Sequence, residues 1–155
     1  MQGVIRAVCV SEEKGTEKHP VPSARLVANH GIEGDAHAGP WHRQVSLLSW
    51  EKVKEFNRRG GCVTDGAFGE NLLVSGIDFR SLPIGTVFET PHTKLRLTQI
   101  GKECHSHCAI YHRVGACIMP HEGVFAEVLT GGDVAPGEIM TVMPPAPQEG
   151  QDAPV

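Results

Sequence analysis

Short β-prone runs separated by glycine and proline are the feature that most limits the folds open to this sequence. The chain has 18 Gly and 11 Pro among its 155 residues. Many short strands with this punctuation are typical of a barrel. We therefore predict a mainly β protein, a β-barrel with a few short helices in a single domain. The β-prone runs lie at 4–10, 24–28, 43–48, 71–74, 86–89, 95–100, 123–129 and 138–143.

One segment departs from this pattern and predicts a helix from Trp50 to Arg59. Trp50, Val53 and Phe56 recur every three residues and therefore share one helical face. We expect the Ser49 side chain to cap the helix and Gly60 to end it in the left-handed conformation. The remaining connections are expected to be a polar loop at 11–22, an irregular glycine-rich loop at 31–40, and turns at 78–85 and 131–132.

Charge and hydropathy exclude several protein classes. The net charge of −4 is opposite to the basic excess that a general nucleic-acid coat needs. No apolar run approaches the about 20 residues of a membrane span, and the N-terminus lacks the pattern of a signal peptide. We expect a cytoplasmic protein with no nucleic-acid or membrane partner. Its folded domain is expected at 1–143, and a proline-rich disordered tail at 144–155.

The segment 101–112 concentrates thiols and imidazoles. It holds two of the five cysteines and three of the nine histidines, directly after a predicted strand. In a helical turn, Cys104 and Cys108 would lie on one face, and Lys102 and His105 are close enough in sequence to favour the thiolate form of either. A thiolate is both a nucleophile and a ligand for soft metals. The segment is therefore predicted to be the chemical centre of the protein.

Other interpretations of this segment remain open. Both cysteines can be buried and inert, or they can form a disulfide, which the cytosol disfavours. Zinc is the main rival, although the paired Cys-x-x-Cys spacing of common zinc sites is missing. The candidate zinc ligands are Cys104, His105, His107, Cys108, His112, Cys117 and His121. By contrast, Cys9 is expected to be a small buried apolar residue in the first strand, and Cys62 is read as structural.

The glycine-rich loop is followed by residues suited to anion binding. Arg43 can hold an oxyanion with two hydrogen bonds, and nearby glycines let backbone amides approach such a ligand. His37 and His42 flank the same loop, and Asp35 can orient a histidine. The alternative is a turn in which Asp35 caps its own backbone and both histidines are solvated.

A second polar pair, Glu70 and Asn71, stands at the entry to a predicted strand. The Asn71 amide can bind donor and acceptor atoms of a heterocycle, and Glu70 can pair with Arg43. The alternative is an ordinary strand-entry turn that uses both side chains for structure.

Taken together, these segments resemble the MOSC domain, the family related to the C-terminal part of molybdenum-cofactor sulfurase. The resemblance covers about residues 3–143. The segments that carry it are Gly34-Asp-Ala-His-Ala-Gly39, His42-Arg-Gln-Val-Ser-Leu-Leu48, Phe68-Gly-Glu-Asn-Leu72, Leu82-Pro-Ile-Gly-Thr86, the cysteine segment and the closing run from Gly123 to Gly137.

The resemblance implies a MOSC-type β-barrel and a role with the molybdenum cofactor (molybdopterin). It also implies a reactive cysteine at the end of a strand in a positively charged pocket, which is Cys104 or Cys108 here. The same cysteines would be the metal ligands. Cofactor-binding residues carried over by the resemblance are His37, His42, Arg43, Glu70 and Asn71, with Lys102 added and His105 in the place of a family arginine.

We therefore expect a protein that binds the cofactor, carries sulfur as a cysteine persulfide, or both. The large sulfurases add a pyridoxal-phosphate domain, for which this chain has no room, so a separate cysteine desulfurase is expected as sulfur donor. The expected acceptor is a molybdoenzyme or a cofactor-biosynthesis protein. Two alternatives remain: a molybdenum-dependent reductase of N-hydroxylated compounds with a separate electron donor, and a zinc-stabilised binding protein. Enzymatic activity is left open between sulfurtransferase and reductase.

Overall fold

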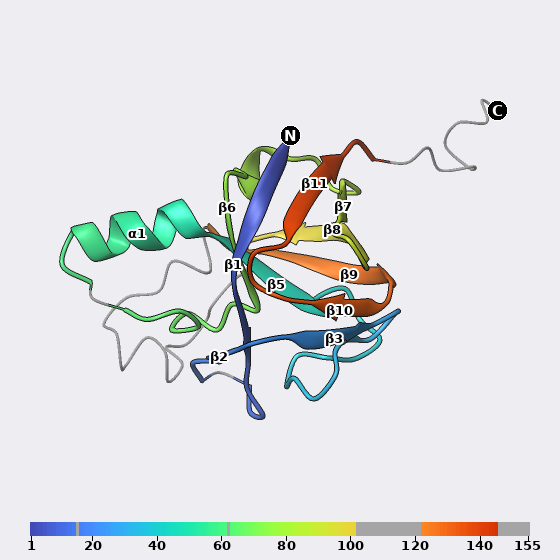
Figure 1. Cartoon of the computed structure of the whole chain (residues 1–155), viewed down its shortest axis with the longest axis horizontal. Coiled ribbons are helices and arrows are strands. Elements are labelled where there is room, and N and C mark those ends of the chain that lie inside the picture. Colours follow the sequence, from blue (N-terminus) through green and yellow to red (C-terminus); the bar gives the residue numbers. More distant parts are fainter. Residues whose placement is uncertain (15, 62, 102–121, 146–155) are drawn as a thin grey trace.

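Seven strands pair edge to edge and close into a barrel in the computed structural model, which describes residues 1–14, 16–61, 63–101 and 122–145. Only β5 and β6 are parallel, and every other pair of neighbours in the barrel is antiparallel. The closed sheet confirms the predicted mainly β fold (Figure 1). In order around the barrel the strands are β1 (Gln2–Val10), β6 (Leu72–Ser75), β5 (Val45–Ser49), β9 (Val124–Thr130), β8 (Lys94–Ile100), β7 (Val87–Glu89) and β11 (Ile139–Met143).

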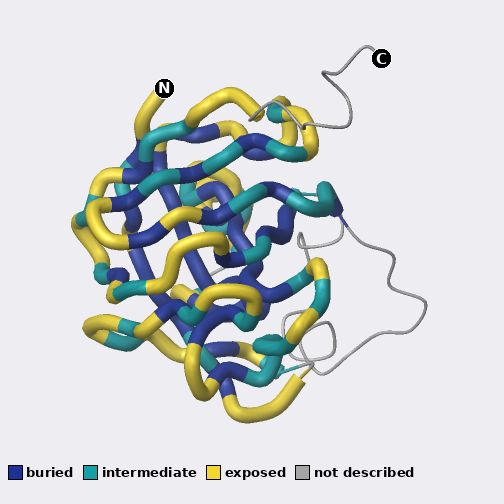
Figure 2. The backbone as a smooth tube through the Cα atoms, turned by 90° about the vertical axis from the view of Figure 1, so that its right-hand side faces the viewer, coloured by how far each residue is buried: buried dark blue, intermediate teal, exposed yellow. Residues whose placement is uncertain are grey.

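Apolar residues fill both the inside of the barrel and one patch on its outer wall. Strand β8 shows the expected alternation, because Leu95 and Leu97 point inward and are fully buried. On β5, Leu47 belongs to the interior cluster, whereas its neighbour Leu48 belongs to the outer cluster. In Figure 2 the buried stretches of the backbone, in dark blue, lie mostly in the interior, and the exposed stretches, in yellow, lie mostly at the periphery.

The helix α1 (Trp50–Arg58) covers the outer apolar patch. Val53 is 4% exposed, and Trp50 and Phe56 pack against the same cluster, so the predicted helical face is confirmed. Gly60 follows the helix with a positive φ of 99°, as expected for a terminating glycine. The predicted cap is wrong, because the Ser49 hydroxyl donates to the carbonyl of Ile77, 3.0 Å away, and makes no capping bond.

Four short elements lie in segments that were predicted as loops or turns. β2 (His19–Val21) pairs with the end of β1, inside the predicted polar loop. β4 (Gly31–Ile32) and β10 (Gly132–Val134) flank β3 (Ala24–Val27) in a separate three-stranded sheet, so residue 132 belongs to a strand and not to a turn. The 3₁₀ turn η1 (Phe79–Ser81) lies within the predicted connection at 78–85. The three strands are too short or too polar to show a strand pattern in the sequence, and η1 is a single short turn.

The segment expected as a tail falls largely outside the described residues. The last strand ends at Met143, and residues 146–155 are not described. Among the helices that are described, none has the length and hydropathy needed to span a bilayer.

Candidate functional site

The loop between β4 and β5 carries three of the predicted site residues, and Asp35 anchors it. One carboxylate oxygen of Asp35 accepts hydrogen bonds from the Ser11 backbone N–H (3.0 Å) and from Lys18 Nζ (2.8 Å). The other accepts the backbone N–H of His37 (3.0 Å). Asp35 therefore caps its own loop, as the simpler interpretation predicted, and also joins that loop to the end of β1.

Lys18 and Asp35 form an ion pair whose side chains are both fully buried. Burial alone would raise the pKa of Asp35. The hydrogen bond and charge of Lys18, with the N–H groups of Ser11 and His37, outweigh this effect and hold the pKa below its usual value. The loop thus has an ionised carboxylate and an ammonium group built into its base.

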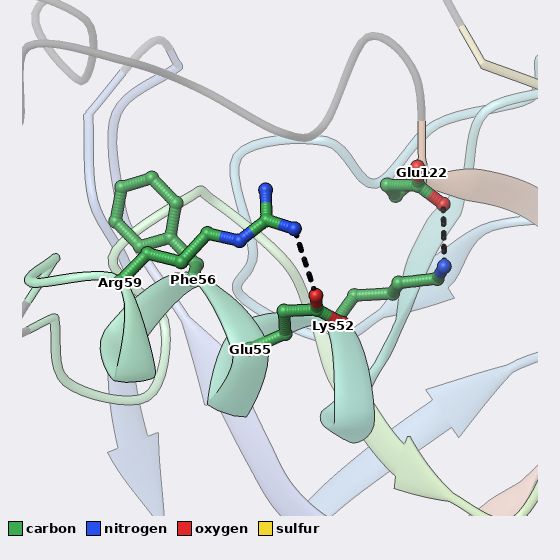
Figure 3. A pocket seen from close by; sticks show the side chains of 5 residues that line it. All are labelled: Lys52, Glu55, Phe56, Arg59 and Glu122. Carbon is green, nitrogen blue, oxygen red and sulfur yellow. Dashed lines mark hydrogen bonds and ion pairs between the residues drawn. The ribbon is translucent and has the colours of Figure 1, made fainter.

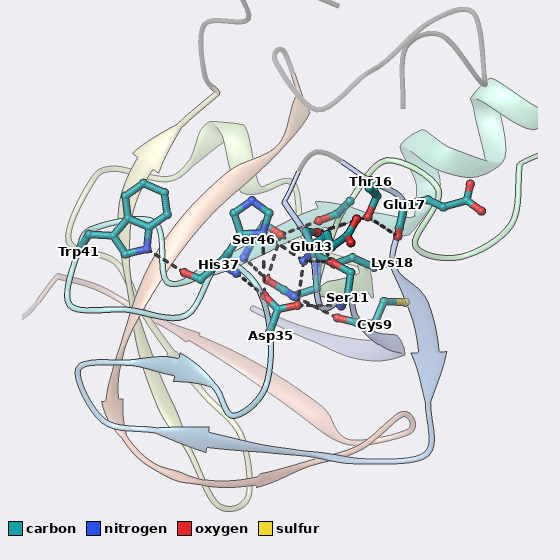
Figure 4. Close-up of polar contacts among 12 residues, drawn as sticks. Cys9, Ser11, Glu13, Thr16, Glu17, Lys18, Asp35, His37, Trp41 and Ser46 are labelled. Carbon is teal, nitrogen blue, oxygen red and sulfur yellow. Dashed lines mark hydrogen bonds and ion pairs between the residues drawn. The ribbon is translucent and has the colours of Figure 1, made fainter. Parts of the chain in front are cut away.

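His37 lies between Lys18 and Trp41, as Figure 4 shows. Its Nδ1 is 3.1 Å from Lys18 Nζ and 3.9 Å from the nearer oxygen of Asp35. The indole N–H of Trp41 donates to the His37 carbonyl at 2.8 Å. Lys18, which the sequence did not single out, therefore lies closer to the His37 ring than Asp35, the residue that was expected to orient it.

The guanidinium of Arg43 is held by aromatic rings. Its central carbon lies 4.7 Å from the ring centroid of Trp41 and 5.7 Å from that of Phe125. Lys14 Nζ lies 5.2 Å from the Trp41 ring and adds a second cation. Within the described part of the chain, the buried Nε of Arg43 has no hydrogen-bond partner. A buried cationic donor without an acceptor is an unusual and costly arrangement that an anionic ligand would relieve.

His42 is fastened to the strand that leads into the cysteine segment. Its Nε2 lies 2.7 Å from Oε1 of Gln99, whose amide nitrogen donates to the carbonyl of Gly101 at 2.7 Å. The Gly101 N–H donates in turn to the carbonyl of Gly123 (2.7 Å), so the two ends of the segment between them are fixed side by side. His42 and Arg43 therefore lie against the point where residues 102–121 leave the barrel.

The predicted reactive and metal-binding residues of that segment lie outside the described residues. This applies to Cys104 and Cys108, to the cofactor residues Lys102 and His105, and to all seven candidate zinc ligands. In the ranges that are described, no three His, Cys, Asp or Glu side chains come together as a metal site. The assignments of these residues stay predictions.

Glu70 and Asn71 are fully buried and hold backbone groups. Glu70 accepts the N–H groups of Gly66 (2.8 Å) and Phe68 (3.1 Å). The ion pair predicted between Glu70 and Arg43 is not formed in the described structure, because these backbone groups occupy the carboxylate instead. Burial raises the pKa of Glu70 to about 7, against the opposing effect of these hydrogen bonds.

Asn71 connects three segments with one amide group. Its oxygen accepts the backbone N–H of Ser46 (2.9 Å) and the Ser46 hydroxyl (3.1 Å), and its nitrogen donates to the Cys9 carbonyl (3.0 Å). The visible role of this residue is therefore to tie β5 to β1, as the strand-entry interpretation expected. Cofactor binding by Glu70 and Asn71 stays a prediction.

Cys9 is buried, as predicted, in the apolar cluster beneath α1. Burial, followed by the negative charges of Glu70 and Asp65, raises the pKa of its thiol far above the ordinary value. Thiolate chemistry is therefore disfavoured at Cys9.

A hollow beside α1 offers a contrast to the loop around Arg43 (Figure 3). Among the described residues that line it, both cations are paired, Lys52 with Glu122 at 3.9 Å and Arg59 with Glu55 at 3.0 Å, and Phe56 also lines the hollow. The charges of these described lining residues balance, so they supply no excess positive charge to attract an anion. The loop that carries Arg43 is the better candidate for anion binding.

Five contributors to the site were not predicted: Lys14, Lys18, Trp41, Gln99 and Phe125. Lys18 falls in a segment that was predicted to be a polar loop, and Gln99 is a polar residue expected on the solvent-exposed face of a strand. The only sequence signal was proximity, since Trp41 stands next to His42. The contacts of Lys18 with His37 and of Gln99 with His42 join residues 19 and 57 positions apart, so they depend on how the barrel closes.

Comparison with known proteins identifies the fold and the family. The family model for the MOSC domain matches residues 33–141. The uncharacterized protein YflK of Bacillus subtilis is 28% identical in an alignment of 141 residues that covers 81% of this chain and 61% of that protein. The chain therefore spans less than two thirds of this curated relative.

Solved structures give the same answer at the level of the fold. The YuaD protein of Bacillus subtilis superposes with a TM-score of 0.76 at 19% identity, covering 92% of this chain and 96% of that one. YiiM from Geobacillus stearothermophilus gives 0.69 at 22% identity, over 91% and 75% of the two chains. YiiM from Escherichia coli gives 0.67 at 18% identity, over 96% and 72%. With its barrel closed and most of its length matched by the family model, the chain belongs to the MOSC domain family.

Proposed function

We propose that this protein binds a pterin-based molybdenum cofactor through its phosphate group and carries sulfur on Cys104 or Cys108. The observation that supports this most is the buried Nε of Arg43, which has no hydrogen-bond partner among the described residues and lies near the end of β8, where the cysteine segment begins. The MOSC family is associated with this cofactor, and an oxyanion is the ligand that such a guanidinium accepts best.

The residues of the loop fit a phosphate group. Arg43 supplies donors in a fixed plane, because the rings of Trp41 and Phe125 restrict its rotation. His42 and His37 add imidazoles on the same loop, and Lys14 adds positive charge beside Trp41. When bound, the cofactor supplies a redox-active metal that prefers sulfur ligands. The role of the chain is to hold the phosphate and to present a thiolate.

The sulfur transfer that we propose needs no external oxidant. The thiolate of Cys104 or Cys108 attacks the terminal sulfur of a persulfide on a cysteine desulfurase. A new S–S bond forms on this chain, the S–S bond of the donor breaks, and the donor leaves as a thiolate. The sulfur then passes to a molybdoenzyme or to a cofactor-biosynthesis protein.

The first experiment tests cofactor binding. The protein is purified from a host that makes the cofactor, and molybdenum, zinc and pterin are quantified in wild type, Arg43→Ala and Arg25→Ala. Arg25 is the matched control, since it lies in an exposed pair with Asp133. We expect pterin in wild type and in the Arg25 variant and at least a tenfold loss in the Arg43 variant. Equal pterin in all three, or none in wild type, would contradict the proposal.

The second experiment tests the sulfur carrier. After incubation with a desulfurase and cysteine, intact mass should increase by ~32 Da for one added sulfur atom. The adduct should survive one of the replacements Cys104→Ser and Cys108→Ser and disappear with the other. If it survives both, or never forms, neither cysteine carries sulfur.

The same assays separate the two alternatives. Pterin without a sulfur adduct favours the molybdenum-dependent reductase, which then requires a separate electron donor. Zinc without pterin favours a zinc-stabilised binding protein.

A further inference from the structure

We propose that Lys18 is a positioning residue that fixes the tautomer of His37, with Nδ1 as the hydrogen-bond acceptor and Nε2 carrying the proton. The use of this N–H toward a phosphate rests on the proposed function. The tautomer itself rests only on the contacts around Lys18.

The first step is the inventory of donors and acceptors at Lys18. An ammonium group has three N–H donors and no acceptor. Its nitrogen lies 2.8 Å from Asp35 Oδ1, 3.1 Å from Ser11 Oγ and 3.1 Å from His37 Nδ1. Three donors thus meet three partners, and Nδ1 must present a lone pair.

The neighbouring groups agree with this assignment. The Ser11 hydroxyl donates its own proton to the carbonyl of Glu13 (2.9 Å), which leaves its oxygen free to accept from Lys18. Asp35 Oδ2 is occupied by the backbone N–H of His37 at 3.0 Å and lies 3.9 Å from the ring nitrogen, too far for a hydrogen bond. The carboxylate therefore fixes the backbone of His37, whereas the ammonium fixes its ring.

Burial makes this arrangement persistent. The side chains of Lys18 and Asp35 are both fully buried, so water does not compete for their hydrogen bonds. The His37 side chain is 22% exposed, so part of its ring faces outward while Nδ1 stays in the buried cluster. Lys18 thereby keeps Nδ1 as a hydrogen-bond acceptor, which places the ring proton of a neutral His37 on Nε2.

Removal of Lys18 should reverse the tautomer. The Asp35 carboxylate, 3.9 Å from Nδ1, would then act on that nitrogen without the opposing charge of Lys18, and a negative charge favours a proton there. We expect Lys18→Met to shift His37 to the Nδ1–H tautomer or to the doubly protonated ring.

The experiment measures this directly by two-bond ¹H–¹⁵N correlation of ¹⁵N-histidine-labelled protein at pH 7, with the His37 signals assigned through His37→Gln. Wild type and the exposed-lysine control Lys14→Met should show the Nε2–H pattern for His37. The Lys18→Met variant should lose that pattern. An Nδ1–H or rapidly averaged pattern in wild type, or an unchanged pattern in folded Lys18→Met, overturns the proposal.

The design remains decisive if the variant does not fold. The wild-type spectrum alone tests the assignment, and Lys18→Met combined with Asp35→Asn removes both charges and so avoids an unpaired buried carboxylate. Because the spectra use protein without cofactor, their outcome is separate from that of the pterin assay. Absence of pterin would contradict the proposed function and leave the tautomer standing, whereas the wrong tautomer would refute the role of Lys18 whatever the pterin content.

Discussion

Asp35 and Glu70 are both buried carboxylates, and each accepts two backbone N–H groups from residues near it in the fold. Asp35 also has Lys18 at 2.8 Å, whereas the charges acting on Glu70 include the negative Asp65. The pKa of Asp35 is lowered and that of Glu70 is raised to about 7, with burial opposing the first shift and causing the second. A single buried cation therefore decides which of two similar carboxylates is ionised.

The comparison extends to the surroundings of each carboxylate. The loop that contains Asp35 also holds Arg43 and His42, and Lys14 lies beside it, so positive charge gathers there. The corner at Glu70 and Asn71 connects backbone groups of β1, β5 and the loop after α1. The first region is built to present charge and the second to hold the barrel together.

The largest expected effect is from Lys18→Met, which leaves Asp35 buried without its counter-ion. Breaking a buried ion pair from one side should lower the free energy of unfolding by about 3–5 kcal/mol. Urea denaturation followed by circular dichroism measures this. Lys94→Met is the control, since the Lys94–Glu89 pair is 48% and 42% exposed and should contribute less than about 1 kcal/mol. Equal losses in the two variants would remove the distinction between the regions.

Asn71→Ala tests the structural corner. The substitution leaves the Ser46 N–H and the Cys9 carbonyl buried without partners, and each such group costs about 1–3 kcal/mol. We expect a loss of about 2–4 kcal/mol in urea denaturation. Asn57→Ala is the matched control, because Asn57 also makes two backbone bonds, to Val63, but in a partly exposed position where water can replace them. A larger loss in the control would show that burial does not govern these bonds.

The two carboxylates should give opposite pH dependences. The folded pKa of Glu70 is about 7, above the ordinary 4.5, so its contribution to stability is complete below about 4.5 and is lost as pH rises through 7. The pKa of Asp35 is lowered, so its contribution is present above its ordinary pKa of 3.8 and is lost as pH falls through the folded value.

Unfolding free energy measured from pH 4.5 to 8 in wild type and Glu70→Gln tests this directly. As pH rises, wild type should lose unfolding free energy relative to Glu70→Gln, because the variant has no carboxylate to ionise at this position. A constant difference across this range would mean that Glu70 titrates at its ordinary pKa.

The barrel could be predicted from sequence because its main strands carry their own signals. The alternation of β8 and the spacing of Trp50, Val53 and Phe56 are local patterns, and both appear in the structure. β2 and β10 were not predicted. His19 to Val21 is exposed or half-buried and so lacks a buried apolar face, and β10 begins with glycine. Local patterns thus predict elements whose one face is buried and miss those that only complete an edge.

The site was predictable in its residue types but not in its contacts. Arg43 and the histidines are visible because cationic residues cluster beside glycines. The roles of Lys18 and Glu70 were not visible, because burial and partner choice follow from packing between distant segments. The opposite charges of Glu70 and Arg43 suggest an ion pair in the sequence. In the structure, the Glu70 carboxylate instead accepts hydrogen bonds from backbone amides of the loop that contains Glu70.

Trp41 gives the smallest expected effect and the sharpest test of what holds the charged loop. Trp41→Phe keeps an aromatic ring for Arg43 and Lys14 but removes the indole N–H that donates to the His37 carbonyl, a loss of about 1 kcal/mol in unfolding free energy. Trp41→Leu also removes the cation–π contacts and should cost about 0.5–1 kcal/mol more.

The useful readout is the order of the two variants in pterin content. If the ring of Trp41 keeps Arg43 in place, Trp41→Phe should retain most of the pterin, and Trp41→Leu should lose most of it although its stability falls only slightly further. Equal pterin content in the two variants would mean that the guanidinium needs no aromatic support. The charged loop would then resemble the corner at Glu70, where hydrogen bonds to the backbone are sufficient.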